Sequence, residues 1–369
     1  MIAIVIPCET EFSDRKILGK TALEHLIIRL NEGFDKIIIG ENVSDIEQVK
    51  SEESDIFVIP GDMPLVGSND LESLLKFHTQ NDNDISYIEN VNGGGVCFFK
   101  PAVLIETTLA CGIGNIENLI RNASDKGLKT GGYITDNKAD FTRANNIAGF
   151  HKISETLKIH ANFTFEERGV HIFDLNRCYI DSGVEIGKGT VIYPDVIIEG
   201  KTTIGENCVI GPGCHFKNMT IGNRTHMSNT IAYDSEVGDN TETGPFAYIR
   251  PGSKIGSNCK VGDFVEVKNS VMGDGAKASH LTYIGDADIG ENVNLGCGTV
   301  VVNYDGKNKF RTVVEDDCFI GCNTNLISPV TVKKGAFVAA GSTITDDVPE
   351  ETLAIARAKQ INKSGWKRP

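Results

Sequence analysis

The chain has 369 residues and carries 50 acidic against 36 basic side chains, a formal net charge of -14 at pH 7. This length exceeds one ordinary compact domain, so we expect two domains, or one domain beside a repetitive element. The acidic balance repels phosphate backbones and anionic lipids, which argues against nucleic acid and against a membrane surface as partners.

The first residues and the cysteines point to a cytoplasmic protein. No apolar run reaches the roughly 18 residues of a spanning helix, and the start MIAIVIPCETE turns acidic too soon for a signal peptide. The 10 cysteines include no Cys-x-x-Cys pair and no Cys/His cluster at zinc spacing. We therefore expect reduced thiols, no disulfide and no structural metal.

Residues 1–144 are expected to form a small α/β domain with a largely parallel sheet. Strand-like runs (IAIVI, KIIIG, IFVIP, GGVCFF) alternate there with helix-like runs (ALEHLIIRL, DLESLLKFH). In residues 145–170 apolar positions recur at helical spacing as far as Gly169, which predicts a linker helix.

Residues 171–348 repeat every six residues. An aliphatic side chain, often followed by Gly, recurs in several runs, the first of which holds Ile180, Ile186, Ile192, Ile198, Ile204 and Ile210. This period is typical of a parallel β-helix, in which three short strands make one coil and the aliphatic residue points inward. The expected fold class is therefore α/β plus all-β, and residues 349–369 follow as a basic tail.

Departures from the repeat indicate where the coil surface is specialised. When the shortened and lengthened repeats are counted through, one outward column, two residues after the inward anchors, holds Asp263, His280, Cys297, Cys322 and Ala340. On the adjoining face Arg250 and Lys268 stand where Gly is usual, eighteen residues apart. We expect this basic pair to stack in neighbouring coils.

Each feature has an ordinary explanation and a functional one. A surface Lys or Arg is normally a solvated charge, but two that stack in this way suit the oxygens of a sugar phosphate. His280 is either a turn residue or a general base, since histidine exchanges a proton near neutral pH. Glu266, on the same face one coil earlier, is expected to orient the His280 ring. His215 and His226 share no column with His280, so a zinc site is not expected.

The segments TGPFAYIRPGS, GDFVEVKNS, AKASHLTYIGDADIGENVNLGCGTVVVNYDGKNKFRT and LAIARAKQ resemble the acetyltransferase half of a known bifunctional family. It is the N-acetylglucosamine-1-phosphate uridyltransferase/glucosamine-1-phosphate acetyltransferase family. The resemblance covers residues 144–369. It implies a left-handed β-helix, direct transfer of acetyl from acetyl-CoA to the sugar amine, and a homotrimer that binds the coenzyme between neighbouring helices.

Matched residue by residue, the resemblance places the general base on His280. It implies sugar-phosphate contacts from Arg250, Lys268, Tyr283, Asn294 and Lys309. It also implies acetyl-CoA contacts from Cys297, Asn303, Tyr304, Cys322, Ala340, Arg357 and, in the tail, Trp366. Because several of these are small, we expect the pantetheine arm to lie along the coils, and residues 349–369 to contribute to the coenzyme site.

The first domain departs from the same family. Relatives begin with a glycine-rich loop that holds the nucleotide phosphates, whereas IVIPCETEFSDRKILGK has no glycine before Gly19. Glu9, Glu11 and Asp14 lie there instead and would repel a triphosphate. Only 21 residues separate Gly40 from Asp62, so the segments that bind uracil and the N-acetylated sugar have no counterpart.

Remnants of the nucleotidyltransferase site persist in this domain. By resemblance, Asp62 and Asn145 would hold Mg²⁺ and Lys16 would match a catalytic lysine. An Asp after a Gly at a strand end is also common turn chemistry. We expect a shortened nucleotidyltransferase-like domain that is inactive, so that Mg²⁺ is required only if uridyl transfer has been retained.

The expected function is glucosamine-1-phosphate N-acetyltransferase in UDP-N-acetylglucosamine biosynthesis. Three alternatives remain at this point: a full bifunctional enzyme, an acetyltransferase for another amino sugar, and a noncatalytic trimeric scaffold. Nucleotide binding by the first domain, the preferred amino sugar, the downstream pathway and assembly beyond the trimer all remain open.

Overall fold

The computed structural model describes residues 1–50, 52, 54–91, 95–111 and 116–367. The chain divides into two compact units, Met1–Leu157 and Lys158–Pro369. The division lies inside α6 (Ile147–Glu167), which occupies most of the stretch expected to be a linker helix. None of the described helices is long and apolar enough to cross a membrane.

The described part of the first unit forms a six-stranded sheet in the order β2-β1-β3-β5-β4-β6. Its strands are β1 (Ile2–Ile6), β2 (Lys36–Ile39), β3 (Ile56–Pro60), β4 (Ile85–Ile88), β5 (Cys97–Phe99) and β6 (Thr130–Tyr133). The sheet is largely parallel, as expected, because among the described strands only β5 runs antiparallel to its neighbours.

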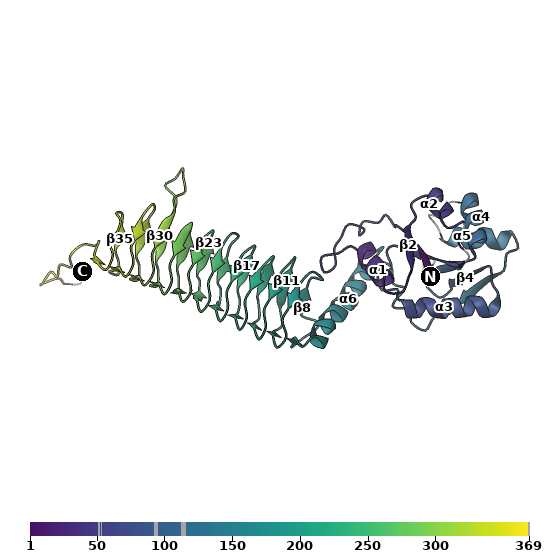
Figure 1. Cartoon of the computed structure of the whole chain (residues 1–369), viewed down its shortest axis with the longest axis horizontal. Coiled ribbons are helices and arrows are strands. Elements are labelled where there is room, and N and C mark those ends of the chain that lie inside the picture. Colours follow the sequence, from purple (N-terminus) through teal and green to yellow (C-terminus); the bar gives the residue numbers. More distant parts are fainter. Residues whose placement is uncertain (51, 53, 92–94, 112–115, 368–369) are drawn as a thin grey trace. The chain divides into compact units, whose positions relative to one another are not determined.

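Helices cover both faces of this sheet (Figure 1). They are α1 (Ala22–Leu30), α2 (Val43–Glu47), α3 (Ser68–Asn81), α4 (Pro101–Cys111) and α5 (Ile116–Asp125). Alternate residues of β1 face opposite sides: Ile4 packs with α2, α4 and α5, and Val5 packs with α1 and α3. Since every residue of β1 is buried, this strand lies in the middle of the α/β core.

The described strands of the second unit form three parallel sheets of eleven, ten and nine strands. The eleven-stranded sheet contains β7 (His171–Ile172), β10 (Val191–Ile192), β13 (Val209–Ile210), β16 (His226–Met227), β19 (Glu242–Thr243), β22 (Lys260–Asp263), β25 (Lys277–His280), β28 (Asn294–Leu295), β31 (Phe319–Ile320), β34 (Phe337–Val338) and β36 (Leu353–Ala354). The ten-stranded sheet contains β8 (Cys178–Ile180), β11 (Val196–Glu199), β14 (His215–Lys217), β17 (Ile231–Tyr233), β20 (Tyr248–Ile249), β23 (Glu266–Lys268), β26 (Tyr283–Gly285), β29 (Val300–Val302), β32 (Asn325–Ile327) and β35 (Thr343–Ile344). The nine-stranded sheet contains β9 (Glu185–Ile186), β12 (Thr203–Ile204), β15 (Thr220–Ile221), β18 (Glu236–Val237), β21 (Lys254–Ile255), β24 (Val271–Met272), β27 (Ala287–Ile289), β30 (Thr312–Val314) and β33 (Thr331–Val332).

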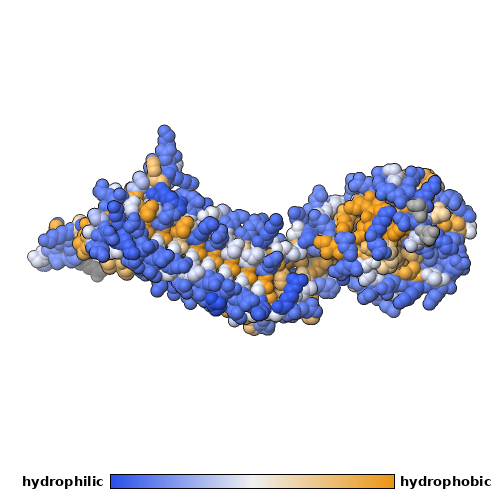
Figure 2. Space-filling view, viewed as in Figure 1, coloured by the Kyte–Doolittle hydropathy of each residue, from blue (hydrophilic) through white to orange (hydrophobic). Residues whose placement is uncertain are grey.

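These sheets are the three walls of the expected left-handed β-helix, which Figure 1 shows as a stack of coils. Each strand pairs in register with the strands one coil away, so that Ile192 lies beside Ile210 and both are fully buried. The coil continues beyond the expected boundary at Val348, because β36 pairs with β34. Apolar surface runs along the coils between hydrophilic bands (Figure 2).

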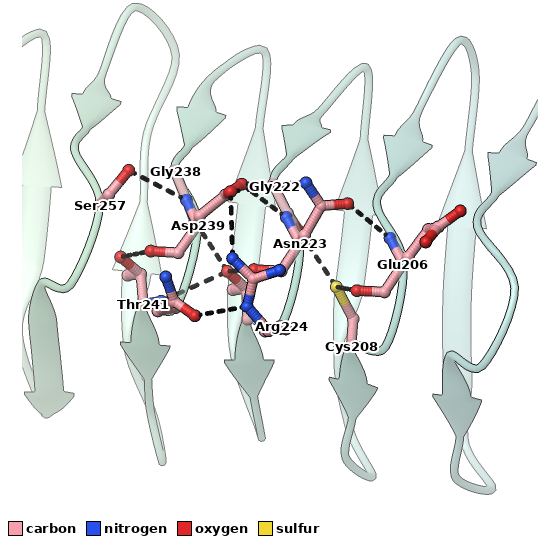
Figure 3. A network of polar contacts seen from close by, with 11 residues as sticks. Glu206, Cys208, Gly222, Asn223, Arg224, Gly238, Asp239, Thr241 and Ser257 are labelled. Atoms are coloured by element: carbon pink, nitrogen blue, oxygen red, sulfur yellow. Dashed lines mark hydrogen bonds and ion pairs between the residues drawn. The ribbon is translucent and has the colours of Figure 1, made fainter.

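Side chains at the corners bond to the backbone of the next coil, as Figure 3 shows for one column. The Glu206 amide donates to Oδ1 of Asn223 at 2.9 Å, and the Asn223 amide donates to Oδ1 of Asp239 at 2.7 Å. The Asp239 amide in turn donates to Oγ of Ser257 at 3.2 Å. Polar corner residues thus satisfy amides that the sheets leave unpaired.

Several cysteines fill small positions inside the coil. Cys208 is buried, and its Sγ lies 3.0 Å from the carbonyl oxygen of Gly222. Burial raises the pKa of the Cys214 thiol to about 12. All nine cysteines whose side chains the structure describes are free thiols.

Candidate active site

His280 lies at a corner of the coil, at the end of β25. It is paired with Asp263 at the end of β22, one coil earlier. Nδ1 of His280 is hydrogen-bonded to Oδ1 of Asp263, and this bond holds the pKa of the Asp263 carboxyl below its ordinary value. The carboxylate accepts, so the ring proton lies on Nδ1 and Nε2 carries the lone pair. The His280 side chain is 58% exposed, so a substrate can reach the ring from solvent.

The expectation that Glu266 orients His280 is wrong. Glu266 begins β23, which belongs to the ten-stranded sheet and not to that of His280. Its Oε1 lies 2.8 Å from Nη1 of Arg250, so the carboxylate is committed to the basic face. The sequence had already grouped Asp263 with His280 in one column, but it gave no sign of which acid would reach the ring.

Arg250 and Lys268 stack in neighbouring coils, as expected. Their predecessors Ile249 and Val267 are paired, and the Arg250 amide donates to the Val267 carbonyl at 2.8 Å. Nζ of Lys268 lies 3.1 Å from Oδ2 of Asp286. The two side chains, each paired with a carboxylate, form a strip of basic residues on the face next to His280.

Lys309 joins this strip from the loop between β29 and β30. The loop closes through a bridge between Tyr304 and Lys309. The positive charge of Lys268, with a smaller effect from Arg250, lowers the pKa of Lys309. The Asp286 carboxylate offsets only one of these two positive charges, so a surplus positive charge remains at this place. We call Arg250, Lys268 and Lys309 the basic cluster.

Tyr283 faces the same cluster. A Cβ added at Gly285 would lie 2.4 Å from its hydroxyl oxygen, so the phenol ring lies over this glycine. Gly285 is paired with Lys268 in the preceding coil. The Tyr283 hydroxyl therefore lies beside Lys268 of the basic cluster, and any side chain at Gly285 would displace this hydroxyl.

Asp286 is the carboxylate partner of Lys268 in the basic cluster. It is nearly buried and accepts hydrogen bonds from Lys268, from Nδ2 of Asn269 at 2.7 Å and from Nδ2 of Asn303. Burial opposes the charge, but these donors together hold the pKa of Asp286 below its ordinary value. Asn303, which the resemblance assigned to the coenzyme, thus has its amide on Asp286, beside the basic cluster.

The remaining coenzyme candidates continue the His280 column. Cys297 is half-buried, whereas Cys322 and Ala340 are exposed. The three residues occupy equivalent positions in successive coils. The Asn323 amide, next to Cys322, donates to the Cys297 carbonyl at 2.8 Å, and the Gly341 amide, next to Ala340, donates to the Cys322 carbonyl at 2.8 Å. We call Cys297, Cys322 and Ala340 the small-residue column.

Four further predicted residues differ in their relation to this column. Asn294 is half-buried on β28, paired with Lys277 of the His280 strand. Arg357 is exposed, and its Cδ lies 3.8 Å from where a Cβ of Gly341 would be. Tyr304 is 54% exposed and donates its hydroxyl to the Gly306 carbonyl at 2.6 Å, while Trp366 is 75% exposed. The structure thus brings Asn294 and Arg357 to the column and leaves the two aromatic side chains open to solvent.

Sequence reasoning missed the corner residues beside His280. Phe246, Phe264 and Leu281 have φ of 61°, 56° and 46°, a left-handed conformation that bulky side chains rarely adopt. All three are more than half exposed, and the two phenyl rings stack 5.3 Å apart. The signal was present, because the equivalent corners hold Asn or Gly elsewhere in the coil, as at Asn323. Backbone strain is thus stored next to the candidate base.

In the first unit, Asp62 is not arranged as a metal ligand. It is buried, and both of its carboxylate oxygens lie 3.0 Å from Nε of Arg143. Nη2 of Arg143 lies 3.4 Å from Sγ of Cys8. The Arg143 guanidinium therefore occupies the position at the Asp62 carboxylate that a divalent cation would need. In this arrangement Asp62 cannot bind Mg²⁺.

The other nucleotidyltransferase remnants do not complete a site. Asn145 is exposed, and its Oδ1 accepts from Asn146 at 2.9 Å. Lys16 is also exposed. Asn145 and Arg143 line a hollow of about 580 Å³ in this unit. Among the described residues, no group of three or more His, Cys, Asp or Glu side chains is arranged to hold a metal ion.

Comparison with known proteins agrees with this architecture. The family model described as bacterial transferase hexapeptide (six repeats) matches residues 183–218, 234–269 and 311–346. The bifunctional protein GlmU of Clostridioides difficile (strain 630) is 37% identical over 392 residues, which cover 95% of this chain and 85% of that protein. The bifunctional protein GlmU of Geobacillus sp. (strain WCH70) is 42% identical over 358 residues, which cover 84% and 76%. An Arabidopsis UDP-N-acetylglucosamine acyltransferase structure aligns with 51% of this chain and 69% of its own at 19% identity and a TM-score of 0.41.

The coil of transferase repeats, with a histidine at one corner and a nucleotidyltransferase-like α/β unit ahead of it, defines a hexapeptide-repeat acyltransferase. The long alignments narrow this class. The chain belongs to the family of the bifunctional GlmU proteins, in which it has an acetyltransferase role.

Proposed function

We propose that this protein is a glucosamine-1-phosphate N-acetyltransferase that uses His280 as its general base. The observation that carries the proposal is the basic cluster, in which Arg250 is paired with Glu266 and Lys268 with Asp286, so that Lys309 leaves a surplus positive charge for an anion. A phosphate bound there would lie on the face that adjoins the His280 corner, because β25 ends at His280 and β26 begins three residues later, at Tyr283. Glucosamine 1-phosphate carries its amine and its phosphate on neighbouring carbons, which suits that short span.

The chemistry needs one proton acceptor. The amine attacks the carbonyl carbon of acetyl-CoA while Nε2 of His280 takes a proton from the nitrogen. A C–N bond forms, the C–S bond breaks, and the proton on His280 is passed to the leaving thiolate of coenzyme A. Asp263 stabilises the imidazolium that forms between these two steps.

The basic cluster supports a phosphorylated sugar over an unphosphorylated one. Arg250 and Lys268 are already paired with Glu266 and Asp286, so each brings little net charge of its own. Lys309 adds the surplus positive charge. The rival substrate, another amino sugar, would use the same His280. The two substrates are distinguished by testing whether acetyl transfer requires a phosphate on the anomeric carbon.

Acetyl-CoA is assigned to the small-residue column, with Arg357 toward a coenzyme phosphate. The small side chains support this, because a bulky one would obstruct a pantetheine arm lying along the coils. The relatives carry the name GlmU, and the resemblance implies a homotrimer in which a neighbouring subunit completes the coenzyme site. The proposed assembly is therefore a cytoplasmic homotrimer.

We assign no uridyl transfer to the first unit. The Arg143–Asp62 ion pair and the acidic residues Glu9 and Glu11, both exposed, support this assignment. In-line displacement at a triphosphate needs a metal ion and a phosphate cradle together. The bifunctional alternative requires Arg143 to leave Asp62 when UTP and Mg²⁺ bind.

One assay tests these assignments together. Purified protein is incubated with acetyl-CoA and a panel of amino sugars, with and without a 1-phosphate, and coenzyme A release is followed beside product mass. We expect N-acetylglucosamine 1-phosphate as the main product. UTP and Mg²⁺ added afterwards should yield neither pyrophosphate nor UDP-N-acetylglucosamine. Turnover of unphosphorylated sugars at equal rates would overturn the substrate assignment, and no turnover of any sugar would favour the scaffold.

A further inference from the structure

Two accessible cysteines lie at the same level of neighbouring coils in the small-residue column. Backbone hydrogen bonds of 2.8 Å enclose the pair on both sides, from the Gly296 amide to the Ile320 carbonyl and from the Asn323 amide to the Cys297 carbonyl. Cys297 is half-buried and Cys322 is exposed. Each follows a glycine and holds the same position of its coil.

The other described cysteines differ from this pair. Burial raises the thiol pKa of Cys178 to about 11 and that of Cys214 to about 12. Burial also raises the thiol pKa of Cys8, Cys97, Cys208, Cys259 and Cys318. A buried thiol of raised pKa supplies little thiolate and is chemically inert. Oxidation should therefore select the outward pair.

The spacing of the coils suits a disulfide with some strain. Neighbouring strands lie about 4.8 Å apart, and a disulfide joins Cα atoms about 4.4–6.8 Å apart. Parallel side chains keep their Cβ atoms near the strand spacing, slightly beyond the preferred Cβ separation of a disulfide. A bond formed under such strain is easily reduced again, as reversible regulatory disulfides are.

We propose that Cys297 and Cys322 form a reversible intramolecular disulfide that switches off the coenzyme site. A hydroperoxide is the oxidant. One thiolate attacks a peroxide oxygen, the O–O bond breaks, and a sulfenic acid and hydroxide form. The second thiolate then displaces hydroxide from that sulfur and forms the S–S bond. The two hydroxides take up the two thiol protons, so that two thiols and one hydrogen peroxide yield one disulfide and two waters. A dithiol reductant restores both thiols.

The switching effect rests on the proposed function, because it needs acetyl-CoA to lie along Cys297 and Cys322. A disulfide there draws the two side chains together across the path of the pantetheine arm. Bound acetyl-CoA should in turn shield both sulfurs. Formation of the bond depends on the coil alone and can be measured without any acetyltransferase activity.

The first test detects the bond. Reduced full-length protein is treated with hydrogen peroxide, alkylated under denaturing conditions and digested without reductant. We expect a linked peptide pair that contains Cys297 and Cys322, and slower linkage when acetyl-CoA is present. Cys322→Ser should abolish the link. Cys8→Ser, the matched control in the other unit, should leave it intact. Two alkylated thiols after peroxide, or covalent dimers of the chain in place of the internal link, would overturn the proposal.

The second test concerns activity. Acetyl transfer by the wild-type chain should fall at least tenfold in step with the linked fraction and return after dithiothreitol. Cys322→Ser, compared with its own untreated sample, should lose much less on peroxide treatment. Full activity in a completely linked sample would refute the switch. If the chain has no acetyltransferase activity at all, the proposed function fails, whereas the peptide map still decides whether the disulfide forms.

Discussion

Nδ1 of His280 is hydrogen-bonded to Oδ1 of Asp263, which lies at the same level of the preceding coil. The bond stabilises the carboxylate and keeps the pKa of Asp263 below its ordinary value. It also holds the imidazole in one orientation and one tautomer, with Nε2 free to accept a proton. The coil thereby positions a base that would otherwise rotate freely at an exposed corner.

Replacing His280 by Ala is expected to lower kcat for acetyl transfer by about 10²–10⁴-fold, the usual contribution of a positioned general base. Acetyl-CoA affinity and the melting temperature should stay near the wild-type values, because the side chain is exposed and outside the coil core. Steady-state kinetics and calorimetric titration of acetyl-CoA check both parts. Unchanged turnover would remove His280 from the mechanism.

Asp263 is expected to act through His280 and not on the substrate. Asp263→Ala should lower kcat by about tenfold or more with little change in either KM, since it removes the hydrogen bond and the charge that stabilises the imidazolium. Asp263→Asn keeps an oxygen that accepts from Nδ1 and should retain more activity than the Ala variant. The two substitutions should have no further effect in a His280→Ala background. Equal losses in both variants, or a loss confined to KM, would contradict a positioning role.

The basic cluster is expected to control binding of the phosphorylated sugar. Arg250→Ala and Lys268→Ala should each raise the KM for glucosamine 1-phosphate about tenfold or more, since each removes a charge-assisted contact of about 1.5–3 kcal/mol. The KM for acetyl-CoA should change little. Lys254→Ala is the matched control, because Lys254 is an exposed lysine of the nine-stranded sheet paired with Glu236 at 2.9 Å. An increase in the acetyl-CoA KM alone would move the basic cluster to the coenzyme.

Lys309 should make sugar binding sensitive to alkaline pH. Its pKa is lowered by Lys268, whereas the pKa of Lys268 is raised, because Asp286 outweighs the effect of burial. Lys309 therefore loses its positive charge first as the pH rises, and the KM for the sugar phosphate should rise at a pH below the ordinary lysine range. Lys309→Met should raise the KM at neutral pH and flatten this part of the profile. A profile of the same shape in the variant would exclude Lys309 as the titrating group.

Much of the second unit follows from its period. A repeat of six fixes which residues face inward, and a coil of eighteen fixes that Arg250 lies beside Lys268. The period did not predict which carboxylate would contact His280. Asp263 and Glu266 are three residues apart in sequence, but a corner separates them, so they lie on different sheets and contact different partners. Side-chain direction at a corner depends on the backbone turn, which the repeat does not specify.

In the first unit the sequence identified Asp62 but not its partner. Arg143 is 81 residues away, and the two meet because the chain returns to the end of β3 only after the whole sheet has been built. A short motif match therefore pointed to a metal ligand, whereas the folded chain supplies a guanidinium. Long-range pairing of this kind depends on tertiary packing that no local pattern encodes.

The Arg143–Asp62 pair should stabilise the first unit in place of a metal ion. Arg143→Ala leaves a buried carboxylate without its counter-charge, and the free energy of unfolding of this unit should fall by about 3 kcal/mol. The double variant Arg143→Ala with Asp62→Asn should recover part of that loss, because the uncompensated charge is gone. Mg²⁺ should raise the melting temperature of Arg143→Ala, where Asp62 is free to bind it, and should leave the wild type unchanged; acetyl transfer should remain intact in all of these variants. Stabilisation of the wild type by Mg²⁺ and UTP together would show that Arg143 can leave Asp62, and would restore the bifunctional alternative.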